Sequence, residues 1–210
     1  MTPAVPPYVS LNLPKALRHL KRDPYLTPLI AAHGSPDFKP GRNAFRALTE
    51  SIIYQQLSGK AAVAIWNRFL DLFPGRRFPT PGHLLTVPVA RLRSAGLSTQ
   101  KASYLIDLAT RFCDGTIQPR KFNLMTDEEI AEHLIQVKGI GQWTADMFLM
   151  FALNRPDVLP VGDLGIRNGF RKLYNLRKEP TPVKMMALAE PWRPYRTVAS
   201  WYLWRVLESA

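Results

Sequence analysis

Two glycines set two residues apart, Gly139 and Gly141, interrupt a helix-like apolar pattern over residues 134–145. Glycine lets the backbone turn tightly and leaves its N–H groups uncovered by side chains. A helix that starts just after such a turn presents unsatisfied N–H groups and a positive dipole end, which suit a phosphate oxygen. A lone Gly-x-Gly is usually only a tight turn, but a dinucleotide-binding turn would follow a strand. The pattern therefore predicts a helix-hairpin-helix phosphate clip at about 134–145, with Ile140 packed beneath the turn.

Asp163 is a second candidate for a chemical role. It follows Pro160-Val-Gly162 and precedes a helical pattern, 22 residues after Gly141. Aspartate is a favoured N-cap, so a purely structural role is one interpretation. A carboxylate beside a sugar can also stabilise the positive charge that builds as a glycosidic bond breaks, and can orient or deprotonate a water. The two roles are compatible, and the residues alone leave both open.

The charge of the chain points to a polyanionic partner. Its 28 lysines and arginines against 16 acidic residues give a net charge of +12, which favours nucleic acid or an anionic membrane surface. A membrane-surface protein is the weaker alternative, since no long amphipathic helix has a clean basic face. No apolar run approaches the roughly 20 residues of a membrane span, and the N-terminal residues 1–7 show no secretory signal.

The distribution of metal-binding residue types argues against a metal centre held by side chains. Cys113 is the single cysteine of the 210 residues, so it cannot form an internal disulfide, a thiolate zinc site or an iron–sulfur cluster. The four histidines show no metal-ligand spacing: His19, His33, His83 and His133. We expect no cofactor, and a reducing, cytoplasmic compartment (the nucleoid, if the chain is bacterial).

The elements that must position these residues are all expected to be helices. No segment alternates with period two, and most of the 19 prolines lie at helix starts or in loops. Capping signals precede several helices: Thr80-Pro81, Ser98, Thr126 with Glu129, and Thr181-Pro182. The pattern predicts one all-α domain, residues 1–210, of about ten helices. The expected helices are a first one from Pro14 and others over about 23–32, 44–57, 58–73, 98–113, 126–137, 142–153, 163–173 and 196–208.

Several segments together resemble a known family. The stretches Val137-Lys-Gly-Ile-Gly-Gln-Trp-Thr-Ala-Asp and Asp157-Val-Leu-Pro-Val-Gly-Asp163 are similar to those of the helix-hairpin-helix DNA glycosylase superfamily, most closely 3-methyladenine DNA glycosylase II. Ile53-Tyr-Gln-Gln-Leu57-Ser and Gly96-Leu-Ser-x-x-Lys101-Ala match further family segments, and the resemblance covers about residues 40–208. It implies two helical subdomains with a cleft between them, without the extra N-terminal β domain of the prototype.

The resemblance also implies a function and its residues. The implied function is excision of alkylated bases (3-methyladenine type) from double-stranded DNA by base flipping, in base excision repair, by a chain we expect to be a monomer. Asp163 aligns with the catalytic aspartate, and Leu57 with the residue that fills the space of the extruded base. The implied substrate-binding residues are Trp143, Trp204, Gln56 and Tyr54, with Gln55 as an alternative to Gln56. The remaining DNA contacts fall on Gly139, Ile140, Gly141, Gln142 and Thr144, and a monovalent cation could be held by the carbonyls of Ile135, Val137 and Ile140.

Two other activities remain open from the sequence. Members that also cleave the strand carry a nucleophilic lysine two residues after the second hairpin glycine, where this chain has Trp143. We therefore expect a monofunctional enzyme, with a bifunctional glycosylase/lyase for oxidised bases and a non-catalytic helix-hairpin-helix DNA-binding protein as alternatives. Leu164 and Met147 stand where other members often carry aromatic residues, which predicts a wider and less aromatic pocket.

Overall fold

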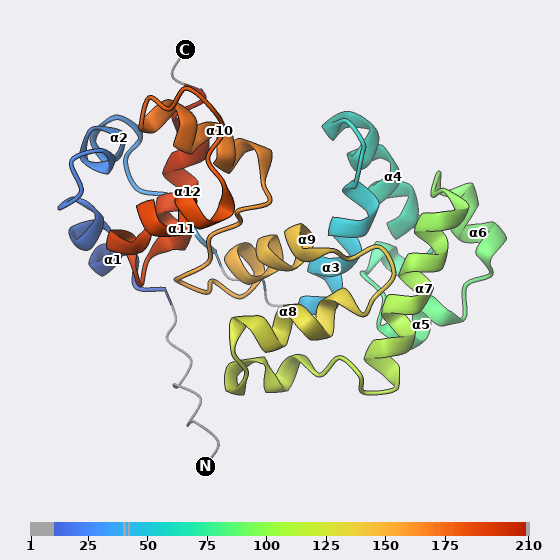
Figure 1. Cartoon of the computed structure of the whole chain (residues 1–210). Coiled ribbons are helices and arrows are strands. Elements are labelled where there is room, and N and C mark those ends of the chain that lie inside the picture. Colours follow the sequence, from blue (N-terminus) through green and yellow to red (C-terminus); the bar gives the residue numbers. More distant parts are fainter. Residues whose placement is uncertain (1–10, 40, 42, 209–210) are drawn as a thin grey trace. The chain divides into compact units, whose positions relative to one another are not determined.

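The computed structural model describes residues 11–39, 41 and 43–208, and over these residues it contains twelve α-helices and no strand (Figure 1). The chain divides into two compact units. Of the described residues, unit 1 takes those within 41–145, and unit 2 takes 11–39 and 146–208. The all-helical prediction and the two helical subdomains are confirmed. The prediction made on residues 1–7 lies outside the described part of the chain.

Unit 1 is built from one continuous stretch of chain. Its longest helix, α7, contacts three others, α3, α5 and α6. The α-helices are α3 (Ala44–Tyr54), α4 (Gly59–Asp71), α5 (Pro81–Leu85), α6 (Val89–Ser94), α7 (Thr99–Cys113) and α8 (Asp127–Ile135), with short 3-10 helices at Pro74–Arg76 and Pro119–Leu124. Trp66 is buried against Phe69 and Phe78 in the core of this unit.

Unit 2 combines the two ends of the described chain. Its helices are α1 (Leu13–Leu20), α2 (Leu26–His33), α10 (Leu164–Leu173), α11 (Pro182–Leu188) and α12 (Arg196–Arg205), with a 3-10 helix at Glu190–Trp192. The core packs α1 and α2 against α12, with Leu20, Leu26 and Trp192 almost fully buried. The Trp192 indole donates to Asp23 Oδ2 at 2.7 Å, so Trp192 has a structural role in this core.

The four capping signals identified in the sequence are confirmed, because in each a side-chain oxygen accepts from one of the first N–H groups of its helix. Ser98 accepts from the N–H of Lys101, and Thr126 forms a full capping box with Glu129. Thr80 and Thr181 each cap a helix whose first residue is proline. These caps depend only on local sequence, which is why local reasoning finds them.

Several predicted helices differ from the observed ones at their ends, and two of these differences affect the site. The helix expected over 44–57 ends at Tyr54, because Gln55 leaves the helical conformation with ψ 132°, and Gln56 after it takes a left-handed backbone with φ +54°. The helix expected over 142–153 is α9 (Gln142–Met147), which crosses from unit 1 to unit 2, followed by a π-helical turn at Phe148–Ala152. There the N–H of Leu153 reaches back five residues to the carbonyl of Phe148 at 3.1 Å. Apolar periodicity cannot distinguish this wider turn from an α-helix.

Candidate active site

The Asp163 carboxylate is held in a fixed direction within unit 2. Asp163 is the N-cap of α10, and its Oδ1 accepts from the backbone N–H of Ile166 at 2.8 Å. The same oxygen accepts from the indole Nε1 of Trp204, on α12, also at 2.8 Å. Asp163 is partly exposed. The predicted cap is thus confirmed, and the carboxylate is also joined to one of the two tryptophans predicted for the pocket.

The contact between Asp163 and Trp204 depends on glycines in α10. A methyl group at Gly165 would lie 2.6 Å from Cδ1 of Trp204 and 3.0 Å from Oδ1 of Asp163. A methyl group at Gly169, one turn later, would lie 2.5 Å from the carbonyl oxygen of Leu203. No Cβ fits at either position without movement, so the two glycines allow α10 to approach α12 closely. Sequence analysis did not single out these residues; their spacing of four within a helix is the signal that could have found them.

A row of three aromatic rings adjoins the carboxylate. The Phe151 ring stacks on Trp204 with centroids 6.0 Å apart, and Phe38 stacks on Phe151 at 5.7 Å. Phe151 lies in the π-helical turn and is 42% exposed. Sequence analysis did not identify Phe38 or Phe151 as neighbours of Trp204. Leu164 itself is exposed directly after Asp163.

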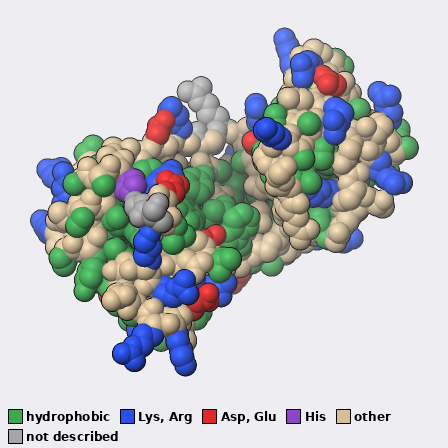
Figure 2. Space-filling view, turned by 90° about the horizontal axis from the view of Figure 1, so that it is seen from above, with side chains coloured by type: hydrophobic (Ala, Val, Ile, Leu, Met, Phe, Trp, Pro, Cys, Tyr) green, Lys and Arg blue, Asp and Glu red, His purple; other side chains and the backbone are tan. Residues whose placement is uncertain are grey.

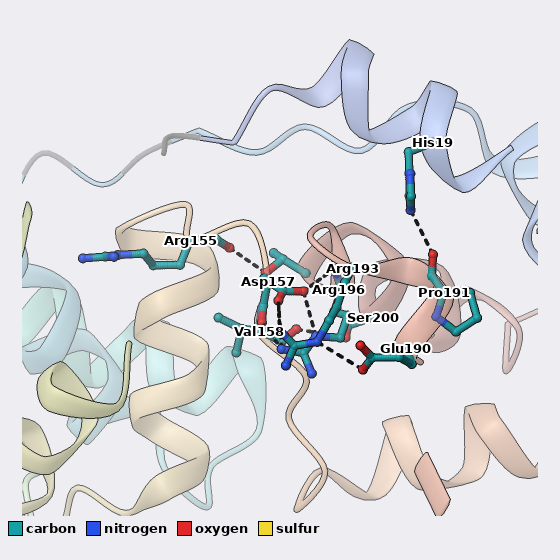
Figure 3. Close-up of polar contacts among 10 residues, drawn as sticks. His19, Arg155, Asp157, Val158, Glu190, Pro191, Arg193, Arg196 and Ser200 are labelled. Carbon is teal, nitrogen blue, oxygen red and sulfur yellow. Dashed lines mark hydrogen bonds and ion pairs between the residues drawn. The ribbon is translucent and has the colours of Figure 1, made fainter. Parts of the chain in front are cut away.

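The loop that leads to Asp163 is bonded to α12 at its start. Arg196 is buried, and its guanidinium donates to both carboxylate oxygens of Asp157, at 2.7 and 2.9 Å, and to the Asp157 carbonyl at 3.0 Å (Figure 3). Arg193 adds a second ion pair at 3.2 Å. The Thr197 hydroxyl accepts from the N–H of Val158 and donates to the carbonyl of Arg155. Because Trp204 lies on the same helix, α12 fixes both ends of the loop.

The glycine turn of unit 1 has the predicted hairpin form, between α8 and α9. Gly139 takes φ +82°, and a Cβ there would lie 2.1 Å from the Tyr104 ring. A Cβ at Gly141 would meet nothing within 4 Å. Gly139 is therefore required by its backbone and its neighbour, whereas Gly141 leaves open space next to the chain. Ile140 is buried as predicted, and its N–H donates to the Val137 carbonyl at 3.0 Å.

The segment Gln55–Ser58, which we call the wedge loop, joins α3 to α4 in the same unit. Leu57 is 37% exposed at this turn and is not a core leucine. The Gln55 side chain donates to the carbonyl of Gly139 at 2.8 Å, across 84 residues of sequence. Gln55 therefore contacts the hairpin. Tyr54 packs edge-on against Trp66.

The remaining predicted residues divide between accessible and buried positions. Trp143 is 49% exposed at the start of α9, and Gln142 is exposed beside it. Thr144 is 5% exposed, so its side chain is withdrawn from the expected DNA contacts. Trp143 belongs to unit 1 and Trp204 to unit 2. Within the described residues no group of three or more His, Cys, Asp or Glu side chains could hold a metal ion.

The exposed surface combines basic and apolar side chains. Lysines and arginines project from both units, and hydrophobic side chains gather on the face of unit 2 seen in Figure 2. Exposed apolar residues of this unit include Phe151, Leu164, Val183 and Met186. No helix in the described part of the chain is long and apolar enough to cross a membrane.

Comparison with known proteins gives the class to which this fold and site belong. Residues 49–194 match the model of the HhH-GPD superfamily of base excision DNA repair proteins, and the chain belongs to that superfamily. It is 38% identical over 180 residues to DNA-3-methyladenine glycosylase 1 of Schizosaccharomyces pombe, covering 83% of this chain and 79% of that protein.

Within the superfamily, the chain is of the 3-methyladenine DNA glycosylase type. The structure of the Schizosaccharomyces pombe 3-methyladenine DNA glycosylase in complex with abasic DNA matches with a TM-score of 0.81 and 37% identity, over 93% of this chain and 98% of that one. A DNA-3-methyladenine glycosidase from Bacillus halodurans matches with a TM-score of 0.84 and 35% identity, over 96% and 92% of the two chains. These matches confirm the predicted family and fold class.

Proposed function

We propose that this chain hydrolyses the N-glycosidic bond of alkylated bases in double-stranded DNA, with Asp163 as its catalytic carboxylate. The observation that carries the proposal is the fixed Asp163 carboxylate, with one oxygen bonded to the Ile166 N–H and the Trp204 indole. The names of the relatives, DNA-3-methyladenine glycosylases, support the substrate class. The product is an abasic site, because Trp143 stands where the lyase mechanism requires a lysine.

The carboxylate acts on the charge that develops in the sugar. As the bond to the base breaks, positive charge builds on C1′ and the ring oxygen. At a separation of ~4 Å and an effective dielectric constant of ~20, a carboxylate stabilises a unit positive charge by about 4 kcal/mol. That energy corresponds to roughly a thousandfold in rate. Asp163 would also orient the attacking water. The two groups that donate to it, the Ile166 N–H and the Trp204 indole, keep the carboxylate in one orientation while the charge forms.

The aromatic row explains a preference for alkylated bases. A purine methylated at N3 or N7 is cationic, so it is both a better leaving group and a partner for electron-rich rings. Cation–π attraction is worth roughly 0.5–2 kcal/mol per contact. We assign Trp204 and Phe151, both in unit 2, to base binding next to Asp163. For Trp143, Tyr54 and Gln56 of unit 1, a role in base binding remains a prediction. This modest binding preference adds to the greater lability of the alkylated base.

DNA engagement is assigned to unit 1. Leu57 is exposed on a turn between two helices, as required of a side chain that replaces an extruded base in the stack. The backbone of Gly139, Gly141 and Gln142 is assigned to the DNA phosphates, because open space beside Gly141 lets the strand approach. The Ile140 N–H is already used within the turn, so Ile140 supports the hairpin. A cation on the carbonyls of Ile135, Val137 and Ile140 remains a prediction, as do a monomeric state and a cytoplasmic location.

The experiment compares the wild type with Asp163→Asn on methylated duplex DNA. We expect the wild type to release 3-methyladenine and the variant to lose roughly a thousandfold in single-turnover rate, while both bind an abasic duplex. Equal release by both proteins would overturn the role of Asp163, and no release by the wild type would favour a DNA-binding protein without activity. A covalent DNA complex trapped by borohydride would instead indicate the bifunctional chemistry.

A further inference from the structure

One face of α7 carries three residues that contact the two segments assigned to DNA. Lys101, Tyr104 and Asp107 follow each other at intervals of three, which places them on neighbouring turns of one side of the helix. We call these three residues the support face. Lys101 contacts the wedge loop, whereas Tyr104 and Asp107 contact the hairpin. All of these contacts lie within unit 1.

Lys101 closes the C-terminal end of α3. Its ammonium donates to the carbonyl of Ile53 at 2.7 Å and to the carbonyl of Gln55 at 2.6 Å. The last carbonyls of a helix have no partner inside it and lie at the negative end of its dipole, so a cation there is favourable. Desolvation lowers the pKa of Lys101, so the lysine is placed here at a cost to its charge. A lysine that served only solubility would lie exposed, with no desolvation of its ammonium.

The wedge loop needs such support. Directly after the two carbonyls, Gln56 adopts φ +54°, a backbone region that residues other than glycine rarely occupy. This turn directs the chain so that Leu57 is exposed, and the N–H of Leu57 donates to the Tyr54 carbonyl at a long 3.3 Å. The local bonds of the loop are therefore weak. The two bonds from Lys101 are shorter and charge-assisted, and such bonds are roughly twice as strong as neutral ones.

The same helix holds the hairpin at the other end of the support face. The Tyr104 ring occupies the space where a Cβ of Gly139 would lie. The Asp107 carboxylate accepts from the backbone N–H of Lys138 at 2.9 Å. The wedge loop also contacts the hairpin directly, because the Gln55 side chain donates to the Gly139 carbonyl. The wedge loop and the hairpin are thus connected both directly and through α7.

We propose that Lys101 is a positioning residue for base extrusion, which holds Leu57 at a fixed separation from the hairpin, with Gln55 as the second link. This inference rests on the proposed function, because it assigns Leu57 as the wedge and the hairpin as the phosphate contact. The wedge loop and the hairpin are both held by α7. When the hairpin binds the DNA backbone, Leu57 therefore meets the base stack at a fixed distance from the bound phosphates. Neither Lys101 nor Gln55 contacts the reacting atoms in this role.

The test compares Lys101→Met with Lys101→Arg, and uses Lys121→Met as the matched control. Lys121 is an exposed lysine of the same unit, in the 3-10 helix Pro119–Leu124. Base unstacking is measured by the fluorescence of 2-aminopurine next to a tetrahydrofuran abasic analogue, and chemistry by single-turnover release of 3-methyladenine. We expect Lys101→Met to lower both signals, the rate by about tenfold or more, because a displacement near 1 Å can cost ~100-fold. Arg should restore part of the loss, and the control should match the wild type.

A double-variant experiment distinguishes positioning from general destabilisation. If Lys101 acts through Leu57, adding Lys101→Met to Leu57→Ala should cause little further loss of rate, whereas independent effects would multiply. Gln55→Met provides a second test, should Lys101→Met unfold, and is expected to reduce unstacking in the same direction. Wild-type unstacking by a folded Lys101→Met or Gln55→Met, or multiplying effects with Leu57→Ala, would overturn the inference. Failure of the proposed function shows differently, as absent release by the wild type itself.

Discussion

Gly165→Ala is the most direct perturbation of the bond between Asp163 and Trp204. The added methyl group would lie 2.6 Å from Cδ1 and 2.9 Å from Nε1 of the Trp204 indole. Ordinary van der Waals contact begins at 3.4 Å, so the ring or the helix must move by about 0.8 Å. Overpacking of this kind typically costs about 1–3 kcal/mol of unfolding free energy. Because the indole N–H is one of the donors to Asp163, the same movement alters the direction of the carboxylate.

The activity of Gly165→Ala should fall by more than its stability suggests. A misplacement near 1 Å can cost on the order of 100-fold in rate, and we expect a loss of that size in single-turnover release of 3-methyladenine at a temperature where the variant is folded. Gly162→Ala is the matched control, because a Cβ at Gly162 meets nothing within 4 Å. A folded Gly165→Ala with wild-type rate would show that the indole does not position the Asp163 carboxylate for catalysis.

Three further variants test other parts of the molecule. Gly139→Ala should weaken binding to duplex DNA, measured by fluorescence anisotropy, since its methyl group would overlap the Tyr104 ring at a left-handed φ of +82°. Asp157→Asn leaves the buried Arg196 without its carboxylate, and should lower the unfolding free energy by about 2–3 kcal/mol in chemical denaturation; an unchanged midpoint would show that the pair contributes nothing. Tyr202→Phe removes the hydrogen bond that the Tyr202 hydroxyl donates to the Gly34 carbonyl at 2.6 Å, and should lower the unfolding free energy by about 1 kcal/mol at neutral pH. Burial raises the pKa of Tyr202 from 10.0 to about 12, so the unfolded chain ionises first and the wild type loses stability as the pH rises from 10 through 12. The Phe variant should lose less stability over that range, and parallel stability–pH curves would contradict this.

The sequence predicts those parts of the structure that depend on local chemistry. The cap residues were found because each needs only its own oxygen and the next few N–H groups. Asp163 belongs to this class, since the same side chain serves as cap and as candidate catalytic group. The hairpin was found from Gly139 and Gly141, whose freedom is also a local property.

The features that escaped prediction depend on partners distant in sequence. The left-handed Gln56 follows carbonyls that accept hydrogen bonds from Lys101, some 45 residues later in the sequence. The ring of Phe151 reaches Trp204 through a π-helical turn that apolar periodicity cannot reveal. The position of the Asp163 carboxylate relative to Trp204 follows from the packing of α10 on α12. Such contacts become visible only with the tertiary fold.

The composition of unit 2 from two ends of the chain has a consequence for biosynthesis. The described residues of unit 1 form one continuous segment of the sequence. They can therefore fold as a unit during synthesis, as domains generally do. The helices α1 and α2 are made before unit 1 but complete their core only when α12 has been made, because Leu20 and Leu26 are buried among residues up to 203. A nascent chain that stops near residue 145 would thus present these leucines to solvent, and chaperone binding to such truncated chains should be lost when both leucines are replaced by polar residues.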